Sequence, residues 1–257
     1  MSLIIHERNS GILTLRLDRP SKRNALSREL LDELSQTLSK LESDHDLRVL
    51  VLTGAGDAFC AGTDISELAD LTQAEAGEVS SRGQKICDQI ESFPVPVIAA
   101  INGVAAGGGC ELALACHLRI ASTSATFSLP ETRLGLMPAY GGTQRLSRDI
   151  AVARALEMML AGKQIDATAA LEFGVVNRIV EPDELLVAAG ELASQIAALA
   201  PLAIRACLKA VNEGLKLRFD EGLELERELF ASLFETEDAK EGTRAFLEKR
   251  KPLFKGQ

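Results

Sequence analysis

The sequence predicts an α/β protein whose core of strands and helices is followed by a helical C-terminal part. Two short apolar runs, residues 49–53 and 97–101, have the length and composition of buried strands. Around them, apolar residues recur every three or four positions, as on one face of an amphipathic helix. Beyond residue 180 only helical patterns remain. This order of patterns indicates an α/β core and a helical C-terminal region.

The first predicted elements are a strand and a helix. Leu13, Leu15 and Leu17 alternate with polar residues, so a half-buried strand follows the Asn-Ser-Gly turn at residues 9–11. Ser27 is a candidate N-cap for a helix whose leucines, from residue 30 to residue 41, share one face. That face is predicted to pack inward.

A second amphipathic helix is predicted over residues 73–93, where Pro94 and Pro96 end it. The buried strand 97–101 follows directly. The next predicted elements are short strands at residues 119–122 and 126–128 and a helix from residue 143 through residue 160. After the segment 175–180 the chain is predicted to be helical to its end, with helix starts near Glu181, Pro201, Asp220 and Asp238.

Composition excludes several classes of protein. The 257 residues are 46% hydrophobic, which is enough to bury a sizeable core. A net charge of −9 argues against nucleic acid or an anionic membrane as the main partner. The chain shows no membrane-span pattern and no basic leader, so we expect a cytoplasmic or otherwise intracellular protein. The five cysteines form no Cys-x-x-Cys pair, which favours packed thiols over disulfides or a zinc site.

A run of three glycines, residues 107–109, lies between the strand 97–101 and a segment rich in Ala and Leu. Glycine lets a backbone turn tightly and approach a ligand closely, and the following segment favours a helix. Free N–H groups at such a helix start stabilise an anion, and Glu111 would lie in the first turn. The same turn would form if it served only strand-to-helix packing, so these residues alone leave both interpretations open.

Six motifs follow one another along nearly the whole chain. They are Asp-Arg-Pro-Ser-Lys-Arg-Asn-Ala-Leu at 18–26, Phe-Cys-Ala-Gly-Thr-Asp at 59–64, Gly-Gly-Gly-Cys-Glu-Leu at 107–112, Pro-Glu at 130–131, Gly-Gly-Thr-Gln-Arg-Leu at 141–146 and Phe-Leu-Glu-Lys-Arg-Lys at 246–251. Their order and spacing resemble the crotonase superfamily, the family of enoyl-CoA hydratases and isomerases. The resemblance implies a crotonase-like catalytic core over residues 1–197, built as a spiral of repeated ββα units. It also implies a C-terminal helical oligomerisation region over residues 198–257 that forms homotrimers or homohexamers.

The resemblance also implies a reaction centre. The backbone N–H groups of Ala61 and Gly108 match the family's oxyanion hole, which holds the carbonyl of a coenzyme A thioester. Two such donors stabilise an enolate-like intermediate by roughly 3 kcal/mol each. Glu111 and Glu131 match the glutamates that flank the substrate double bond in hydratases. We assign Glu111 chiefly to the water that attacks C3 and Glu131 chiefly to the proton delivered to C2, although both can share these roles.

Coenzyme A binding is implied for three segments. Its adenine end is expected near Lys22 and Arg23 and along the loop from residue 61 to residue 65. Phe246 and Lys249 match C-terminal positions that approach coenzyme A from an adjoining part of the assembly. Lys22, Arg23 and Lys249 are equally typical of a solvated surface, because each lies in a polar segment. The expected loop residues are Ala61, Gly62, Thr63, Asp64 and Ile65.

Three residues depart from the family pattern. Ala139 stands where glycine is common, and Tyr140 either lines an acyl pocket or packs beside the glycine turn. His117 replaces a common aspartate and is more typical of a structural residue. We predict reversible hydration of a 2-enoyl-CoA to a 3-hydroxyacyl-CoA, with no metal or separate cofactor because coenzyme A is part of the substrate. The alternatives are a double-bond isomerase that uses one glutamate, a non-catalytic acyl-CoA-binding subunit and an RNA-binding member of the family.

Overall fold

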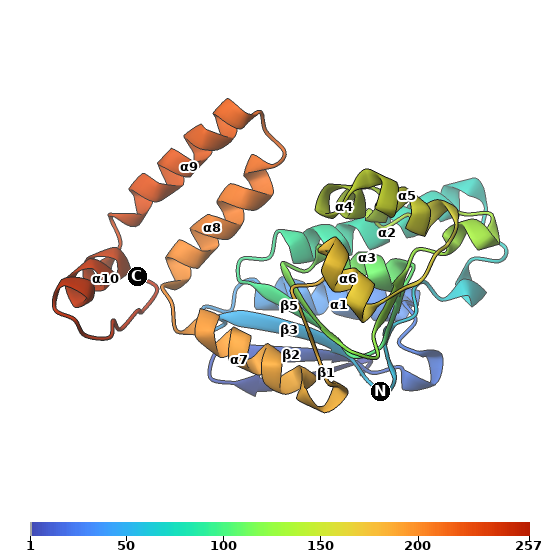
Figure 1. Ribbon diagram of the computed structural model, residues 1–257, viewed down its shortest axis with the longest axis horizontal. Coiled ribbons are helices and arrows are strands. Elements are labelled where there is room, and N and C mark those ends of the chain that lie inside the picture. Colours follow the sequence, from blue (N-terminus) through green and yellow to red (C-terminus); the bar gives the residue numbers. More distant parts are fainter. Residues whose placement is uncertain (1) are drawn as a thin grey trace.

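Two β-sheets organise the chain in the computed structural model, which describes residues 2–257 (Figure 1). The larger sheet has the strand order β1-β2-β3-β5-β7-β10, and the smaller one has the order β4-β6-β8-β9. The strands of the larger sheet are β1 (Ile4–Asn9), β2 (Ile12–Leu17), β3 (Val49–Gly54), β5 (Val97–Ile101), β7 (Leu118–Ser122) and β10 (Arg178–Val180). Those of the smaller sheet are β4 (Ala58–Cys60), β6 (Val104–Ala106), β8 (Thr126–Ser128) and β9 (Ile165–Asp166).

Helices cover the sheets and form the C-terminal part. In chain order they are α1 (Arg28–Leu41), α2 (Gln73–Glu91), α3 (Gly108–Ala115), α4 (Gly142–Asp149), α5 (Val152–Leu160), α6 (Ala167–Phe173), α7 (Leu185–Ala197), α8 (Pro201–Gly214), α9 (Phe219–Leu233) and α10 (Glu237–Leu247). Short 3₁₀ turns connect several of them, including one at Glu131–Leu134.

A strand-strand-helix unit repeats through the core. β3, β4 and α2 form one unit, and β5, β6 and α3 form the next. In both, the first strand joins the larger sheet and the second joins the smaller sheet. β7 and β8 repeat this division, and the strands pair in parallel from unit to unit within each sheet. The predicted spiral of ββα units is therefore confirmed.

The central strands β3 and β5 of the larger sheet are buried on both faces, which explains why β3 is a continuous apolar run. Val49 and Val51 pack with α7 on one face, along which α7 lies in Figure 1. Leu50 and Leu52 point to the opposite face and join the main core with leucines of α1. Burial of one such side chain contributes about 1.5–3 kcal/mol, so this strand is a strongly fixed element.

The N-terminal predictions are largely confirmed. The strand expected after the turn at residues 9–11 is β2, and the Ser27 hydroxyl accepts the Leu30 N–H at 3.3 Å as the N-cap of α1. An additional strand, β1, was not predicted and pairs with β2 across that turn. Most of β1 is solvent-exposed, so it lacks the apolar alternation that reveals a half-buried strand.

Three later predictions need correction. The helix expected through residues 143–160 is two helices, because Ile150 turns to an extended conformation to bury its side chain. α6 was missed, although Asp166 caps it by accepting the Ala169 N–H at 2.8 Å. The chain was expected to be helical to its end, but α10 ends at Leu247 and residues 248–257 are not helical.

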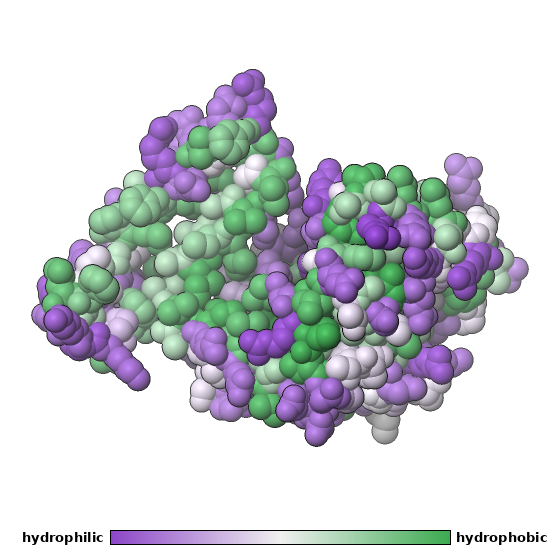
Figure 2. Space-filling view, in the orientation of Figure 1, coloured by the Kyte–Doolittle hydropathy of each residue, from purple (hydrophilic) through white to green (hydrophobic). Residues whose placement is uncertain are grey.

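α8, α9 and α10 stand apart from the sheets (Figure 1). α8 and α9 contain no buried residue within the chain, and Phe219 and Leu215 are 81% and 79% exposed. Figure 2 shows the resulting hydrophobic surface across these helices. Among residues 2–257, no single helix is both long enough and apolar enough to cross a membrane.

Candidate active site

One pocket gathers most of the predicted site residues. β4, β6 and β8 are parallel, so the segments that follow their carboxyl ends meet at one edge of the smaller sheet. Together with the loop that precedes α4, these segments line a pocket of about 810 Å³. The predicted residues that line it are Ala61, Gly62, Thr63, Ile65, Gly108, Glu111 and Glu131.

The outer part of this pocket is apolar. Leu68 and Leu71 come from the segment before α2, and Val79 comes from α2 itself. Leu136 and Met137 come from further along the chain, after the 3₁₀ turn that begins at Glu131. A pocket with a polar inner end and apolar walls suits a ligand that carries a hydrocarbon chain on a polar reactive group.

α3 begins at the inner end of the pocket, immediately after β6. Its close packing requires Gly109, because a Cβ there would lie 2.1 Å from the carbonyl oxygen of Cys60. Gly108 is the first residue of α3, so its N–H has no acceptor inside the helix, and Gly108 lines the pocket. The predicted helix start is confirmed, and its first free N–H group belongs to a residue of the pocket lining.

The prediction for the Ala61 N–H is wrong. This N–H donates to the Arg23 carbonyl oxygen at 2.9 Å and so holds two loops together. Thr63, two residues on, also lines the pocket, and its N–H has no protein acceptor among residues 2–257. Leu26 bonds to the backbone on either side of Thr63, which turns the Thr63 N–H away from Leu26. The sequence does not indicate which N–H group of the loop will donate a hydrogen bond to the neighbouring segment at residues 23–26.

Glu111 is buried, with 1% of its surface exposed, and two backbone donors hold it. Its Oε1 accepts the Tyr140 N–H at 2.8 Å and the Gly142 N–H at 2.7 Å. Burial raises the pKa of Glu111, while these amides and the nearby Arg145 guanidinium oppose that rise. Hydrogen bonds of this kind favour the ionised carboxylate.

Glu131 has a different environment in the same pocket. Its Oε2 is buried and has no hydrogen-bond partner among the described residues. Burial, with a smaller contribution from the charge of Glu111, raises the pKa of Glu131 to about 7. Two carboxyl groups whose surroundings separate their protonation states can divide acid and base work between them.

The other predicted coenzyme A residues lie outside the pocket lining. Lys22 and Arg23 are exposed beside the loop that Arg23 holds through Ala61. The Asp64 carboxylate accepts from Ser66 and pairs with Arg19 at 3.2 Å. Phe246 and Lys249 do not line the pocket of their own chain. Phe246 belongs to α10, Lys249 follows this helix, and Figure 1 shows α10 at the far end of the molecule.

The three departures from the family pattern have distinct positions. Ala139 and Tyr140 line the pocket, and the Thr63 hydroxyl donates to the Tyr140 hydroxyl at 3.0 Å. His117 is remote from the pocket lining. Its Nδ1 accepts the Val97 N–H at 2.9 Å, and its Nε2 lies 3.0 Å from the Glu91 carbonyl oxygen. These bonds give His117 a structural role.

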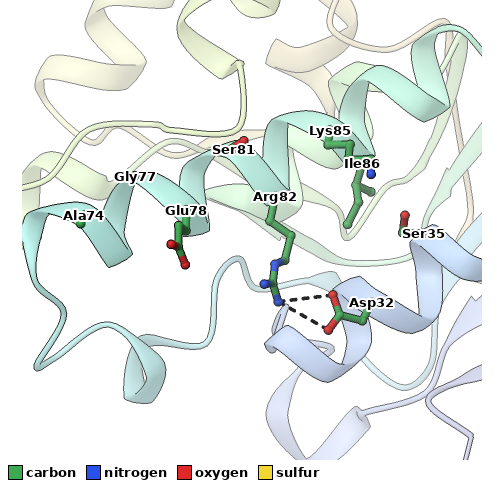
Figure 3. A pocket seen from close by; sticks show the side chains of 9 residues that line it. All are labelled: Asp32, Ser35, Ala74, Gly77, Glu78, Ser81, Arg82, Lys85 and Ile86. Carbon is green, nitrogen blue, oxygen red and sulfur yellow. Dashed lines mark hydrogen bonds and ion pairs between the residues drawn. The ribbon is translucent and has the colours of Figure 1, made fainter.

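A second hollow lies on the other side of α2 (Figure 3). There Arg82 reaches across to Asp32 on α1, with the nearest nitrogen and oxygen 3.3 Å apart. The hollow is open, its lining is both polar and apolar, and the charges of Arg82 and Asp32 are paired with each other. It has neither the free helix-start N–H nor the unpartnered buried carboxyl oxygen of the first pocket, which is therefore the candidate active site.

Comparison with known proteins agrees with the fold. The family model "Enoyl-CoA hydratase/isomerase" matches residues 7–257. The chain is 40% identical to the short-chain-enoyl-CoA hydratase of Clostridium acetobutylicum, over 96% of this chain and 95% of that protein. It is also 40% identical to the crotonyl-CoA hydratase of Syntrophomonas wolfei, over 98% and 97% of the two chains. A crystal structure of an enoyl-CoA hydratase from Bacillus anthracis matches with a TM-score of 0.96 and 40% identity, over 100% of both chains.

The repeated ββα units and the pocket at their strand ends define a crotonase-fold protein. The chain belongs to the enoyl-CoA hydratase/isomerase family.

Proposed function

We propose that this protein adds water reversibly across the C2–C3 double bond of a 2-enoyl-CoA, giving a 3-hydroxyacyl-CoA. One observation carries the proposal: Glu111 and Glu131 share a pocket but have different hydrogen-bonding surroundings. Thr63 and Gly108 line the same pocket, and their N–H groups have no acceptor among residues 2–257. The relatives that are named short-chain-enoyl-CoA and crotonyl-CoA hydratases support it and favour a short acyl chain.

The thioester carbonyl is proposed to lie between Thr63 and Gly108. Attack of water on C3 pushes electron density through C2 onto the thioester oxygen, which becomes an enolate oxygen. Backbone donors aimed at that oxygen stabilise the intermediate more than the substrate, by roughly 3 kcal/mol per donor. The free Thr63 N–H replaces Ala61 in the donor pair expected from the sequence.

The two glutamates are proposed to move the protons. Ionised Glu111 takes a proton from the water as its oxygen bonds to C3. Protonated Glu131 gives a proton to C2 as the enolate collapses, and the two transfers together add one water to the double bond. With a pKa of about 7, Glu131 is substantially protonated near neutral pH, as a general acid requires. The proton left on Glu111 must then return to Glu131 before the next turnover.

Coenzyme A binding and assembly are proposed to be linked. Lys22, Arg23 and the loop at residues 61–65 would bind coenzyme A from the same chain. Phe246 is 83% exposed and remote from its own pocket, so it and Lys249 would serve the pocket of a neighbouring subunit. The exposed apolar surface of residues 198–257 supports a homotrimer or homohexamer built through this region.

The test is to incubate the purified protein with short, long and branched 2-enoyl-CoAs. Loss of the conjugated thioester absorbance together with a mass gain of one water supports hydration. An unchanged mass with a shifted double bond would instead establish an isomerase, and binding without any product would establish a non-catalytic subunit. The Glu111→Gln/Glu131→Gln double variant, tested in parallel, controls for contaminating hydratase.

A further inference from the structure

The position of Glu111 is fixed by a turn, and a residue on the other side of that turn binds it. Both donors to its Oε1, the N–H groups of Tyr140 and Gly142, belong to the turn that leads into α4. If this turn moved, the carboxylate would lose its hydrogen bonds and its position in the pocket together. The residue that fixes the turn therefore also fixes the proposed base.

Arg145 binds this turn. Its Nη1 donates to the Tyr140 carbonyl oxygen at 3.0 Å, and its backbone N–H donates to the Gly141 carbonyl oxygen at 2.9 Å. Gly141 has φ of 106°, and a Cβ there would lie 2.2 Å from Nη1, so the backbone and the guanidinium are in close contact. The side of the turn opposite Glu111 is thus occupied by one charged group.

Arg145 is itself anchored on α2. Its Nη2 lies 2.7 Å from Asp88 and 2.6 Å from Glu91, and its Nε donates to Glu91 at 2.8 Å. The Arg145 side chain is 15% exposed, so water screens these contacts less than on an open surface. A planar guanidinium presents five N–H donors in a rigid fork, whereas an ammonium group has three donors at the end of a flexible stem.

α2 holds the same turn at a second point. The Ala139 carbonyl oxygen accepts from Ser80 at 2.8 Å and from Gln84 at 3.1 Å. Ser80, Gln84 and Asp88 are spaced four residues apart, so they follow one face of the helix. The turn is therefore tied to α2 on one side and to Glu111 on the other.

We propose that Arg145 is a positioning residue for Glu111, transmitting the fixed position of α2 through the Tyr140–Gly142 turn to the carboxylate. It touches neither substrate nor water in this role. The expected effect of an Arg145 substitution on kcat rests on the proposed function. The expected effect on the N–H bonds from Tyr140 and Gly142 to Glu111 does not depend on the reaction.

The charge of Arg145 gives the proposal a pH signature. The groups that interact electrostatically with Glu111 are Cys87 on α2, Cys110 on α3, Glu131 after β8, and Tyr140 and Arg145 from the turn and α4. Burial raises the pKa of both thiols, and it raises that of Tyr140 to about 12, so these three stay neutral near pH 7. Of the remaining two, Arg145 lowers the pKa of Glu111.

The experiment compares Arg145→Gln with Arg148→Gln. Arg148 lies one turn further along α4 and is exposed, and its side chain bonds only to Gln144 among residues 2–257. For Arg145→Gln we expect kcat to fall roughly 10- to 100-fold, as for misplacement of a reacting group, with far less change in KM. The acidic limb of the kcat/KM profile should move to higher pH, because Glu111 needs less acid to become protonated. Arg148→Gln should change neither kcat nor the position of the acidic limb. Arg145→Lys should restore part of kcat and should return the acidic limb most of the way to its wild-type position.

A merely structural role for Arg145 would lower stability without moving the acidic limb. In the Glu111→Gln background, Arg145→Gln should have little further effect on kcat, because the residue that it positions is already disabled. A folded Arg145→Gln enzyme with normal kcat and an unmoved acidic limb would overturn the proposal. If Arg145→Gln does not fold, Arg145→Lys takes its place in the same measurements. An Arg145→Lys enzyme that has a normal kcat, although its crystal structure has lost the Tyr140 and Gly142 N–H bonds to Glu111, would overturn the proposal.

If the wild-type protein hydrates no enoyl-CoA, the proposed function fails and crystal structures decide the positioning claim. The wild-type structure should keep the Glu111 bonds to the Tyr140 and Gly142 N–H groups, and the Arg145→Gln structure should lose at least one. An Arg145→Gln structure that keeps both bonds would contradict the positioning role of Arg145.

Discussion

The pocket and the C-terminal helices are built in opposite ways. Glu111 is held by two backbone N–H groups, and α3 is buried along its whole length. In α8 and α9 no residue is buried, and large apolar side chains such as Phe230 remain 62% exposed. The contrast is consistent with the proposal that one subunit supplies both the acid and the base, while the C-terminal region packs against a neighbouring subunit. The two regions should therefore respond differently to substitution.

Removal of either pocket carboxylate is expected to have the largest effect on turnover. Glu111→Gln and Glu131→Gln should each lower kcat by roughly 10² or more, because a positioned acid or base is lost, while folding and acyl-CoA binding persist. Stopped-flow absorbance and binding titrations measure these quantities. Glu78→Gln, on the exposed face of α2, is the matched control. Near-normal hydration in either pocket variant would remove that residue from the proposed pair.

Disruption of the exposed apolar helices should change assembly before it changes the pocket. We expect Phe230→Glu to dissociate the native oligomer, because a charge would be buried at the proposed interface. Light scattering coupled to gel filtration gives the mass, and acyl-CoA titration tests whether binding weakens as Phe246 and Lys249 are withdrawn. Glu228→Gln, on the same helix and exposed, serves as the control. An unchanged oligomer in Phe230→Glu would contradict the role assigned to residues 198–257.

The raised pKa of Glu131 predicts a pH dependence of both rate and stability. The proposed mechanism needs protonated Glu131, so kcat/KM should fall as pH rises through about 7, and Glu131→Gln should lack this limb. A raised pKa also means that the folded state binds the proton more tightly than the unfolded state. Its stabilising contribution is therefore present below the unfolded pKa and lost as pH rises through about 7.

Thermal melting can test the stability half of that prediction. Glu131→Gln should gain stability relative to the wild type above pH 7, where the wild type buries a charged carboxylate, and the gain should shrink toward pH 4. A stability difference that did not vary with pH would refute the buried, unpaired state of this acid.

The smallest expected effect concerns the Tyr140 hydroxyl. Tyr140→Phe removes the 3.0 Å bond from Thr63 but keeps the ring, so it should cost on the order of 1 kcal/mol of stability and change kcat only slightly.

Tyr140→Ala would open the pocket wall and should raise turnover of branched enoyl-CoAs relative to crotonyl-CoA. Relative kcat/KM values for branched and linear substrates measure this, and an unchanged preference would show that the ring does not shape the acyl site.

The sequence predicts much of the core because local patterns and burial agree there. The apolar run of β3 and the N-cap at Ser27 could both be predicted from neighbouring residues. β1 could not, because a mostly exposed edge strand lacks apolar alternation. Likewise, the break between α4 and α5 depends on the tertiary burial of Ile150.

Within the site, side chains were easier to predict than amides. Glu111 and Glu131 stand out by residue type and motif, and both line the pocket. The choice between the Ala61 and Thr63 N–H groups depends on Arg23 and Leu26, which are remote in sequence. The proposed positioning role of Arg145 cannot be predicted from the sequence for a similar reason, since its partners Asp88 and Glu91 lie on another helix.

The most direct test of the central claim is hydration of crotonyl-CoA in oxygen-labelled water, with wild-type protein and both glutamine variants. The two-carboxyl mechanism predicts that the wild type places labelled oxygen at C3 of 3-hydroxybutyryl-CoA, and that each variant does so at least about 10²-fold more slowly. A wild-type product that has no label and a shifted double bond, or labelled product formed at normal rate by either variant, would contradict it.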